Sequence, residues 1–178
     1  MNGPGHLAIL GLMGVGKTTT AAAVAEELGL ALRDSDADIL ALTGTTGRVQ
    51  AEDHGVVHLH RLEADVLLSA LAEPEPTVIS VAASVVERDE CRQSLRRSAT
   101  VIVLALEHSA LVERIATGAH RRPMDSAAVE SAAARRAPLF AEVADLTLDA
   151  AESTSELTSS IVSFVGRPRP TGGRSGDQ

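Results

Sequence analysis

The chain has 178 residues, a formal net charge of −8 at pH 7 and a hydrophobic share of 44%, which favours one globular domain with a sizeable core. The acidic balance and the scarcity of aromatic residues argue against nucleic acid as the main partner. The single Cys91 excludes an internal disulfide, and no signal peptide or membrane-length apolar run is visible. We therefore expect a cytoplasmic monomer with no membrane partner.

Short apolar runs alternate with segments of helical periodicity along the chain. The predicted strands are residues 7–10, 30–33, 77–81, 100–106 and 145–149. The predicted helices are residues 19–28, 39–43, 56–71, 87–97, 109–115, 127–143 and 153–165, with an irregular helical segment at 45–55. This alternation predicts a three-layer α/β/α fold around a five-stranded parallel sheet. We expect residues 1–166 to form the domain, 117–125 to be a mobile loop within it, and the Pro/Gly/Arg-rich residues 167–178 to be a disordered tail.

The turn between the first predicted strand and helix reads Gly-Leu-Met-Gly-Val-Gly-Lys-Thr over residues 11–18 and fits the phosphate-binding loop. Glycines let the backbone N–H groups turn inward, and the following helix adds the positive end of its dipole. Lys17, the only lysine of the chain, would reach the β- and γ-phosphates, and the Thr18 hydroxyl would ligate Mg²⁺. The alternative, a glycine-rich turn with a coincidental Lys-Thr, is disfavoured by the flanking strand and helix. The residues predicted to bind nucleotide here are Gly11, Gly14, Val15, Gly16, Lys17, Thr18 and Thr19.

With this loop and the later motifs, the chain resembles the shikimate kinase family from about residue 7 to residue 165. Asp34-Ser35-Asp36 is similar to the family's Asp-x-Asp after strand two, and residues 43–63 keep the spacing of its Thr-Gly … Arg-Arg-Ile-Glu segment. Arg122-Pro123 is similar to the lid Arg-Pro, and residues 135–140 to an Arg-x-Pro-Leu-Tyr segment. The resemblance implies a P-loop kinase with a lid that phosphorylates a hydroxyl of a small acceptor, with shikimate, of aromatic amino acid biosynthesis, as the leading candidate.

The resemblance implies that both aspartates after the second strand serve the reaction. Asp34 would help to hold Mg²⁺ through water beside Thr18, at the edge of a parallel sheet where ligands gather. Asp36 would contact the acceptor hydroxyl as a base or as an orienting group, although it could instead cap the helix that follows.

Three arginines complete the implied site. Arg122 would move in with the lid and touch the phosphates, unless it is a solvated residue of a basic loop. Arg136 would hold an acceptor carboxylate with a bidentate fork, unless it is a surface charge of its helix. Arg114 stands where the family stacks a side chain near adenine. On this basis the catalytic residues are expected to be Lys17, Asp36 and Arg122, with ATP and Mg²⁺ as cofactors.

Two departures from the family concern the acceptor. Three consecutive glycines of the family are replaced by Ala82-Ala83-Ser84, and each new Cβ narrows the approach and penalises positive φ. His60 replaces an arginine that grips the carboxylate, and Arg61 cannot take over because one helical residue is a rotation of about 100°. Glu63 shares the face of His60, which could become charged next to a bound carboxylate. The residues expected to line the acceptor site are Asp36, His60, Glu63, Ala82, Ala83, Ser84 and Arg136.

Three functions therefore stay open: a shikimate kinase, a kinase for a related small polyol or hydroxy acid, and a non-catalytic nucleotide-binding regulatory protein. A lid arginine and an acceptor aspartate argue against the third. A nucleoside monophosphate kinase is disfavoured because the segment after strand two lacks the arginines expected around a second phosphate. A zinc site at His54, His58 and His60 is disfavoured because no glutamate follows His54 and Gly55 weakens the helix.

Overall fold

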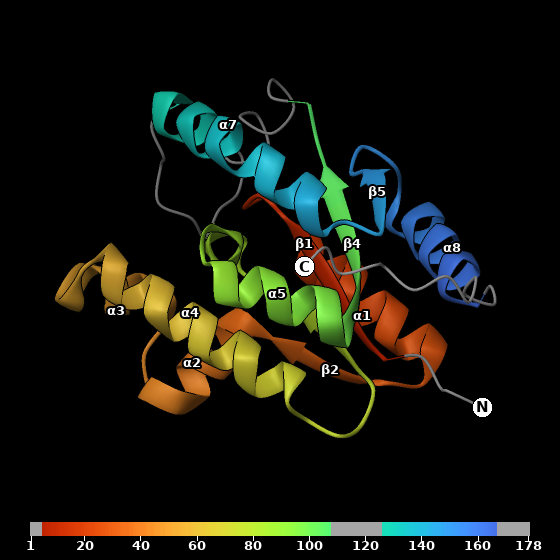
Figure 1. The fold of residues 1–178 in the computed structure, drawn as a ribbon, viewed down its shortest axis with the longest axis horizontal. Coiled ribbons are helices and arrows are strands. Elements are labelled where there is room, and N and C mark those ends of the chain that lie inside the picture. The colour runs from red at the N-terminus through yellow and green to blue at the C-terminus, as the bar shows by residue number, and fades with distance from the viewer. Residues whose placement is uncertain (1–4, 108–125, 167–178) are drawn as a thin grey trace, which may run out of the picture.

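The computed structural model describes residues 5–107 and 126–166, in which strands and helices alternate (Figure 1). The strands are β1 (His6–Gly11), β2 (Ala31–Asp34), β3 (Thr77–Ser80), β4 (Ala99–Ala105) and β5 (Leu146–Asp149). The helices are α1 (Lys17–Leu28), α2 (Ser35–Thr43), α3 (Gly47–His54), α4 (Val56–Leu71), the 3₁₀ helix η1 (Ala83–Glu87), α5 (Asp89–Ser98), α7 (Ser126–Val143) and α8 (Thr154–Val165). The predicted helix 109–115, loop 117–125 and tail 167–178 lie outside the described residues. Over the ranges described, no helix is both long and apolar enough to cross a membrane.

The five strands form one parallel sheet in the order β2-β3-β1-β4-β5. Because all strands run the same way, their carboxyl ends meet at one edge. The chain leaves β1 first towards β2 and later returns to the other side at β4, so the order reverses beside β1. Ligands of open α/β sheets bind outside the strand ends at such a reversal.

Alternating side chains of the strands build one apolar core on each face of the sheet. In β1, Leu7 and Ile9 belong to one buried cluster, and Ala8 and Leu10 belong to the other, as the two-residue period of a strand requires. The first cluster includes side chains of α1 and α8, and the second includes side chains of α4, α5 and α7. Figure 1 shows α1 and α8 side by side, away from α4 and α5. The predicted three-layer α/β/α architecture with a five-stranded parallel sheet is confirmed.

The helix predicted over residues 87–97 is the main local difference. The structure has a 3₁₀ helix over Ala83–Glu87 and a separate α-helix from Asp89 to Ser98. Arg88 between them has φ −100° and ψ 122°, an extended conformation that interrupts helical hydrogen bonding. The resulting bend places Glu87 at the end of η1, at the edge of the sheet that carries the strand ends.

Gly11 joins β1 to the phosphate-binding loop in a conformation that favours glycine. Its φ is +146°, and a Cβ placed on it would overlap the carbonyl oxygen of Leu104 and lie 2.9 Å from the Cγ2 atom of Val15. Gly29, which ends α1, has φ +64° but no heavy atom within 4 Å of such a Cβ. An alanine at Gly29 would therefore meet only the cost of the backbone conformation. An alanine at Gly11 would meet that cost and a steric clash as well.

We expect Gly11→Ala to lower the free energy of unfolding by about 2–4 kcal/mol, because it adds a clash with backbone to an unfavourable φ. Gly29→Ala is the matched control and should cost about 1 kcal/mol, the conformational term alone. Urea unfolding of both variants measures the difference. Equal losses at the two positions would contradict the clash.

Candidate active site

The loop between β1 and α1 has the backbone of a phosphate-binding loop. Gly11, Gly14 and Gly16 have φ values of +146°, +92° and +97°, which side chains rarely adopt. Val15 is buried in the core and fixes the middle of the loop, so the turn is anchored rather than free. Lys17 opens α1, and its Nζ atom donates a hydrogen bond of 3.0 Å to the carbonyl oxygen of Leu12 across the loop. The ammonium group therefore lies over the space that the loop encloses.

The first turn of α1 meets the carboxyl ends of β2 and β3. The Thr18 hydroxyl donates to Oδ2 of Asp34 at 2.9 Å and lies 3.4 Å from the hydroxyl of Ser80. The sheet sets this meeting point, because Asp34 and Ser80 are register partners at the ends of β2 and β3. A hydroxyl and a carboxylate are the hard oxygen ligands that Mg²⁺ prefers, so Thr18 and Asp34 together could hold that ion. Thr19, the next residue of α1, is exposed at the same helix end.

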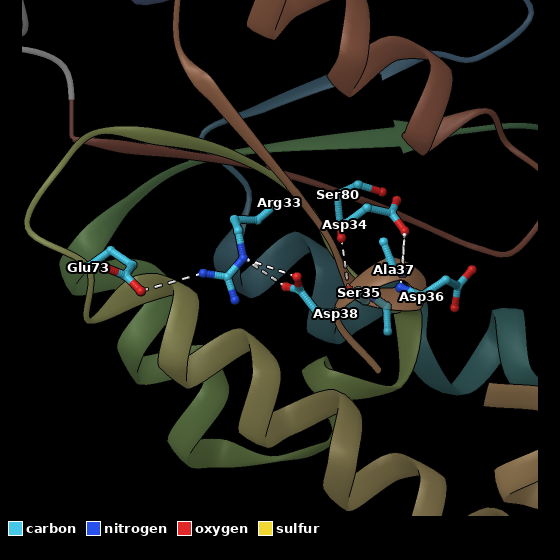
Figure 2. A network of polar contacts seen from close by, with 9 residues as sticks. Arg33, Asp34, Ser35, Asp36, Ala37, Asp38, Glu73 and Ser80 are labelled. Carbon is cyan, nitrogen blue, oxygen red and sulfur yellow. Dashed lines mark hydrogen bonds and ion pairs between the residues drawn. The ribbon is translucent and has the colours of Figure 1, made fainter. Parts of the chain in front are cut away.

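Asp34 has a second task, capping α2, which the sequence analysis considered only as an alternative role of Asp36. Its Oδ1 accepts hydrogen bonds from the backbone N–H groups of Asp36, at 3.0 Å, and Ala37, at 3.2 Å, so Asp34 is the N-cap of α2. The alternative that Asp36 caps this helix is therefore wrong. Figure 2 shows the Asp36 side chain extending from the first turn of α2, away from the capping contacts. This leaves the Asp36 carboxylate exposed at the sheet edge, where it can meet a ligand.

Ser35 links α2 to the segment after β3, a role that the sequence analysis missed. Its hydroxyl donates to the carbonyl oxygen of Ser80 at 2.8 Å and accepts from the backbone N–H of Ala82 at 3.0 Å. The first of these contacts appears in Figure 2. Ser35 is buried, so both bonds are shielded from water. The sequence analysis assigned functional roles to the two aspartates on either side and none to the serine between them.

The Ala82-Ala83-Ser84 segment adopts an unstrained backbone. Ala82 is extended, with φ −62° and ψ 139°, and Ala83 and Ser84 begin η1. Among the described residues, positive φ values occur at glycines alone, so these side chains meet no backbone penalty. The Ser84 hydroxyl donates a short hydrogen bond to Oε2 of Glu63. The segment therefore lines the site with side chains, and one of them fastens η1 to α4.

Glu63 and His60 are both shifted towards their neutral forms. Burial raises the pKa of Glu63 and the charge of Asp36 raises it further, while the Ser84 hydrogen bond, Arg136 and Lys17 oppose the shift. Burial and the charge of Arg136 lower the pKa of His60, against the attraction of Glu87. Burial and the charge of Arg136 both oppose the expectation that His60 could become charged. In this environment the imidazole acts mainly as a neutral group. The same electrostatics place Asp36, Arg136 and Lys17 within interaction range of Glu63.

Arg136 lies on α7, and its side chain faces the group formed by His60 and Glu63 rather than solvent. Its side chain is only 13% exposed, and its Nε donates to Oε1 of Glu87 at 2.7 Å. The alternative of a free surface charge is therefore wrong. Arg135 is 54% exposed and donates to the same oxygen through Nε and Nη2, both at 3.2 Å. The sequence analysis did not find Glu87, because no local pattern links it to arginines 48 and 49 residues later in the chain.

Arg114 and Arg122 lie outside the described residues. His54 and His58 contact each other edge to face, with ring centroids 5.0 Å apart, and His58 pairs with Gln50. Residues 5–107 and 126–166 contain no cluster of three or more His, Cys, Asp or Glu side chains suited to a metal ion.

A phosphate-binding loop on a parallel sheet, with a hydroxyl-carboxylate pair at the first turn of the following helix, is the arrangement of a P-loop kinase. A family model described as "Shikimate kinase" matches residues 13–166. A shikimate kinase of Xanthomonas campestris pv. campestris (strain 8004) is 31% identical over 166 residues, which cover 88% of this chain and 92% of the relative. A shikimate kinase of Symbiobacterium thermophilum is 34% identical over 149 residues, covering 80% and 85%.

A solved structure agrees with these relatives. It is described as shikimate kinase from Acinetobacter baumannii in complex with shikimate, and it matches with a TM-score of 0.84 and 24% identity over 91% of this chain and 93% of that one. The chain belongs to the shikimate kinase family. It is a kinase that phosphorylates a hydroxyl group.

The raised pKa of Glu63 predicts a pH-dependent stability. A carboxyl with a raised folded-state pKa contributes stability that is present below its ordinary value of 4.5 and is lost as the pH rises through the raised value. Glu63→Gln cannot ionise, so we expect its melting temperature relative to wild type to rise between pH 4.5 and pH 8. The exposed Glu52→Gln is the control for loss of an acidic side chain. A relative melting temperature that falls over this range would contradict the burial of Glu63.

Proposed function

We propose that this protein transfers the γ-phosphoryl group of MgATP to a hydroxyl of shikimate. Membership of the family and about 31% identity to named shikimate kinases over most of the chain support this substrate. The observation that carries the proposal is the geometry at the start of α1. Lys17 lies across the phosphate-binding loop, Thr18 is bonded to Asp34, and Asp36 is exposed two residues beyond that pair.

The nucleotide half of the site supplies phosphate binding. Lys17 and the inward-turned N–H groups of the loop would hold the β- and γ-phosphates, and Thr18 with Asp34 would hold Mg²⁺. The ion, when bound, neutralises charge on the phosphates. Phosphoryl transfer needs positioning and charge neutralisation more than covalent help, so these groups account for most of the proposed catalysis.

The acceptor half supplies orientation. The exposed Asp36 carboxylate would accept a hydrogen bond from the reacting hydroxyl and aim its oxygen at the γ-phosphorus. Arg136 would bind the acceptor carboxylate, with His60, whose pKa is lowered, and Glu63, whose pKa is raised, as polar neighbours. From the resemblance alone, Arg122 is proposed to reach the transferred phosphoryl group and Arg114 to lie at the adenine.

A related cyclic polyol or hydroxy acid is the second candidate acceptor. The neutral His60 in place of an arginine and the Ser84 hydroxyl in place of a glycine both reduce selection for a carboxylate and add polar groups. ADP release from MgATP with shikimate and a panel of such compounds tests both candidates. ATP binding without turnover on any acceptor would instead favour a nucleotide-binding regulator.

We expect Lys17→Met to lower kcat for ADP release with shikimate by at least about a hundredfold, because it removes the cation that meets the developing phosphate charge. Arg97→Met is the matched control. Arg97 is exposed on α5 and donates a hydrogen bond to the hydroxyl of Ser94, one helical turn earlier. Circular dichroism checks that both variants fold. Normal turnover by Lys17→Met would exclude the proposed nucleotide site.

His60→Arg tests the acceptor half. A guanidinium beside Arg136 would add a charge-assisted hydrogen bond to the acceptor carboxylate, so we expect KM for shikimate to fall about tenfold with little change in kcat. His54→Arg adds the same charge at an exposed position on α3 and should leave KM unchanged. A KM that rises in His60→Arg would mean that the pocket is shaped for a different acceptor.

A further inference from the structure

Glu87 is placed to act on the acceptor through Arg136. It ends η1, and its Oε1 accepts hydrogen bonds from two consecutive arginines of α7. The contact with Arg136 is the shorter, at 2.7 Å, and the less exposed of the two. A single carboxylate oxygen therefore joins the segment after β3 to the helix that carries the carboxylate-binding arginine.

The contact uses only one edge of the Arg136 guanidinium. The planar group presents N–H donors along two edges, and the recorded bond to Glu87 runs through Nε. The charge of Arg136 also influences the pKa of His60 and of Glu63, two of the residues predicted to line the acceptor site. Glu87 thus fixes one edge of the Arg136 guanidinium. Because the group is planar and rigid, this contact also sets the direction of its other edge.

The same contact changes the charge that an acceptor meets. Burial would raise the pKa of Glu87, but the hydrogen bonds and charges of Arg136 and Arg135 outweigh it and keep this pKa below its ordinary value. Glu87 is therefore an anion at neutral pH, and although it is shared with Arg135 it offsets part of the positive potential of Arg136. An incoming carboxylate is attracted by the arginine and repelled by the glutamate behind it.

We propose that Glu87 is a specificity-determining residue of the acceptor site, which aims the Arg136 guanidinium while weakening its preference for a carboxylate over a neutral group. The inference rests on the proposed function, because it takes Arg136 as the group that meets the acceptor. It makes Glu87 a positioning residue, since it acts through Arg136 and not on the substrate itself.

Glu87→Gln separates charge from geometry. The amide oxygen of glutamine can still accept from Nε of Arg136, while the negative charge is removed. We expect KM for shikimate to fall about three- to tenfold, with kcat within about twofold. The reason is that the repulsion between the Glu87 carboxylate and the carboxylate of the acceptor disappears. KM for the uncharged carboxamide of shikimate should not change. Equal effects on the two acceptors, or a higher KM for shikimate, would overturn the proposal.

Glu90→Gln is the matched control. Glu90 is exposed at the start of α5. Its replacement removes the same charge as Glu87→Gln, and within the described part of the chain it forms no ion pair with Arg135 or Arg136. It should leave both KM values unchanged. A fall in KM like that of Glu87→Gln would assign the effect to net charge and overturn a specific role for Glu87.

The wild-type protein gives a second test that does not depend on a variant folding. If Glu87 offsets Arg136, the KM values of shikimate and its carboxamide should differ by less than about tenfold, whereas an unopposed arginine would give a much larger ratio. A ratio above about a hundredfold would overturn the proposal.

Equilibrium binding distinguishes failure of this inference from failure of the proposed function. If wild type binds MgATP but neither binds nor turns over shikimate, the proposed function fails. In that case, calorimetric binding of shikimate that appears in Glu87→Gln still supports the role of Glu87. Absence of binding in that variant as well would overturn it.

Discussion

The site depends on the two oxygens of Asp34. One caps α2 through the backbone N–H groups of Asp36 and Ala37, and the other accepts from the Thr18 hydroxyl at the start of α1. The parallel sheet makes this possible, because β2 ends level with Ser80 of β3, next to β1. One carboxylate thereby fixes the direction of two helices relative to each other. In the proposed site the first turn of α1 would face the nucleotide and the first turn of α2 the acceptor, so Asp34 would set the separation of the reacting groups.

The acceptor half is governed by a balance of charges rather than by a single cation. The pKa shifts keep His60 and Glu63 towards their neutral forms, and Arg136 is paired with Glu87. Each shift has burial as its first cause, because α4, η1 and α7 close over these side chains and remove water. Arg136, whose side chain is 13% exposed, is paired with Glu87, which it shares with the more exposed Arg135.

Sequence periodicity was sufficient for most of the fold. Apolar runs and helical spacing located every strand of the sheet within a few residues, and the loop motif located the glycine turn between β1 and α1, because both signals are local. The differences lie where a distant contact takes part. The alternative that Asp36 caps α2 is wrong because the end of β2 orients Asp34 for that role, and a 3₁₀ helix precedes α5 where Ser84 and Glu87 bond to α4 and α7. No pattern within a short window carries that information.

The replacement of glycines by Ala82, Ala83 and Ser84 changes the way in which this segment can act. A glycine segment contributes through close approach of its backbone to a ligand, whereas the present segment adopts ordinary extended and 3₁₀ conformations and contributes side chains. Its backbone N–H at Ala82 is already bonded to Ser35, and its one polar side chain is bonded to Glu63. The segment and η1 therefore hold Glu63 directly and Arg136 through Glu87, and in the proposed acceptor site selectivity would follow from how firmly those two side chains are held.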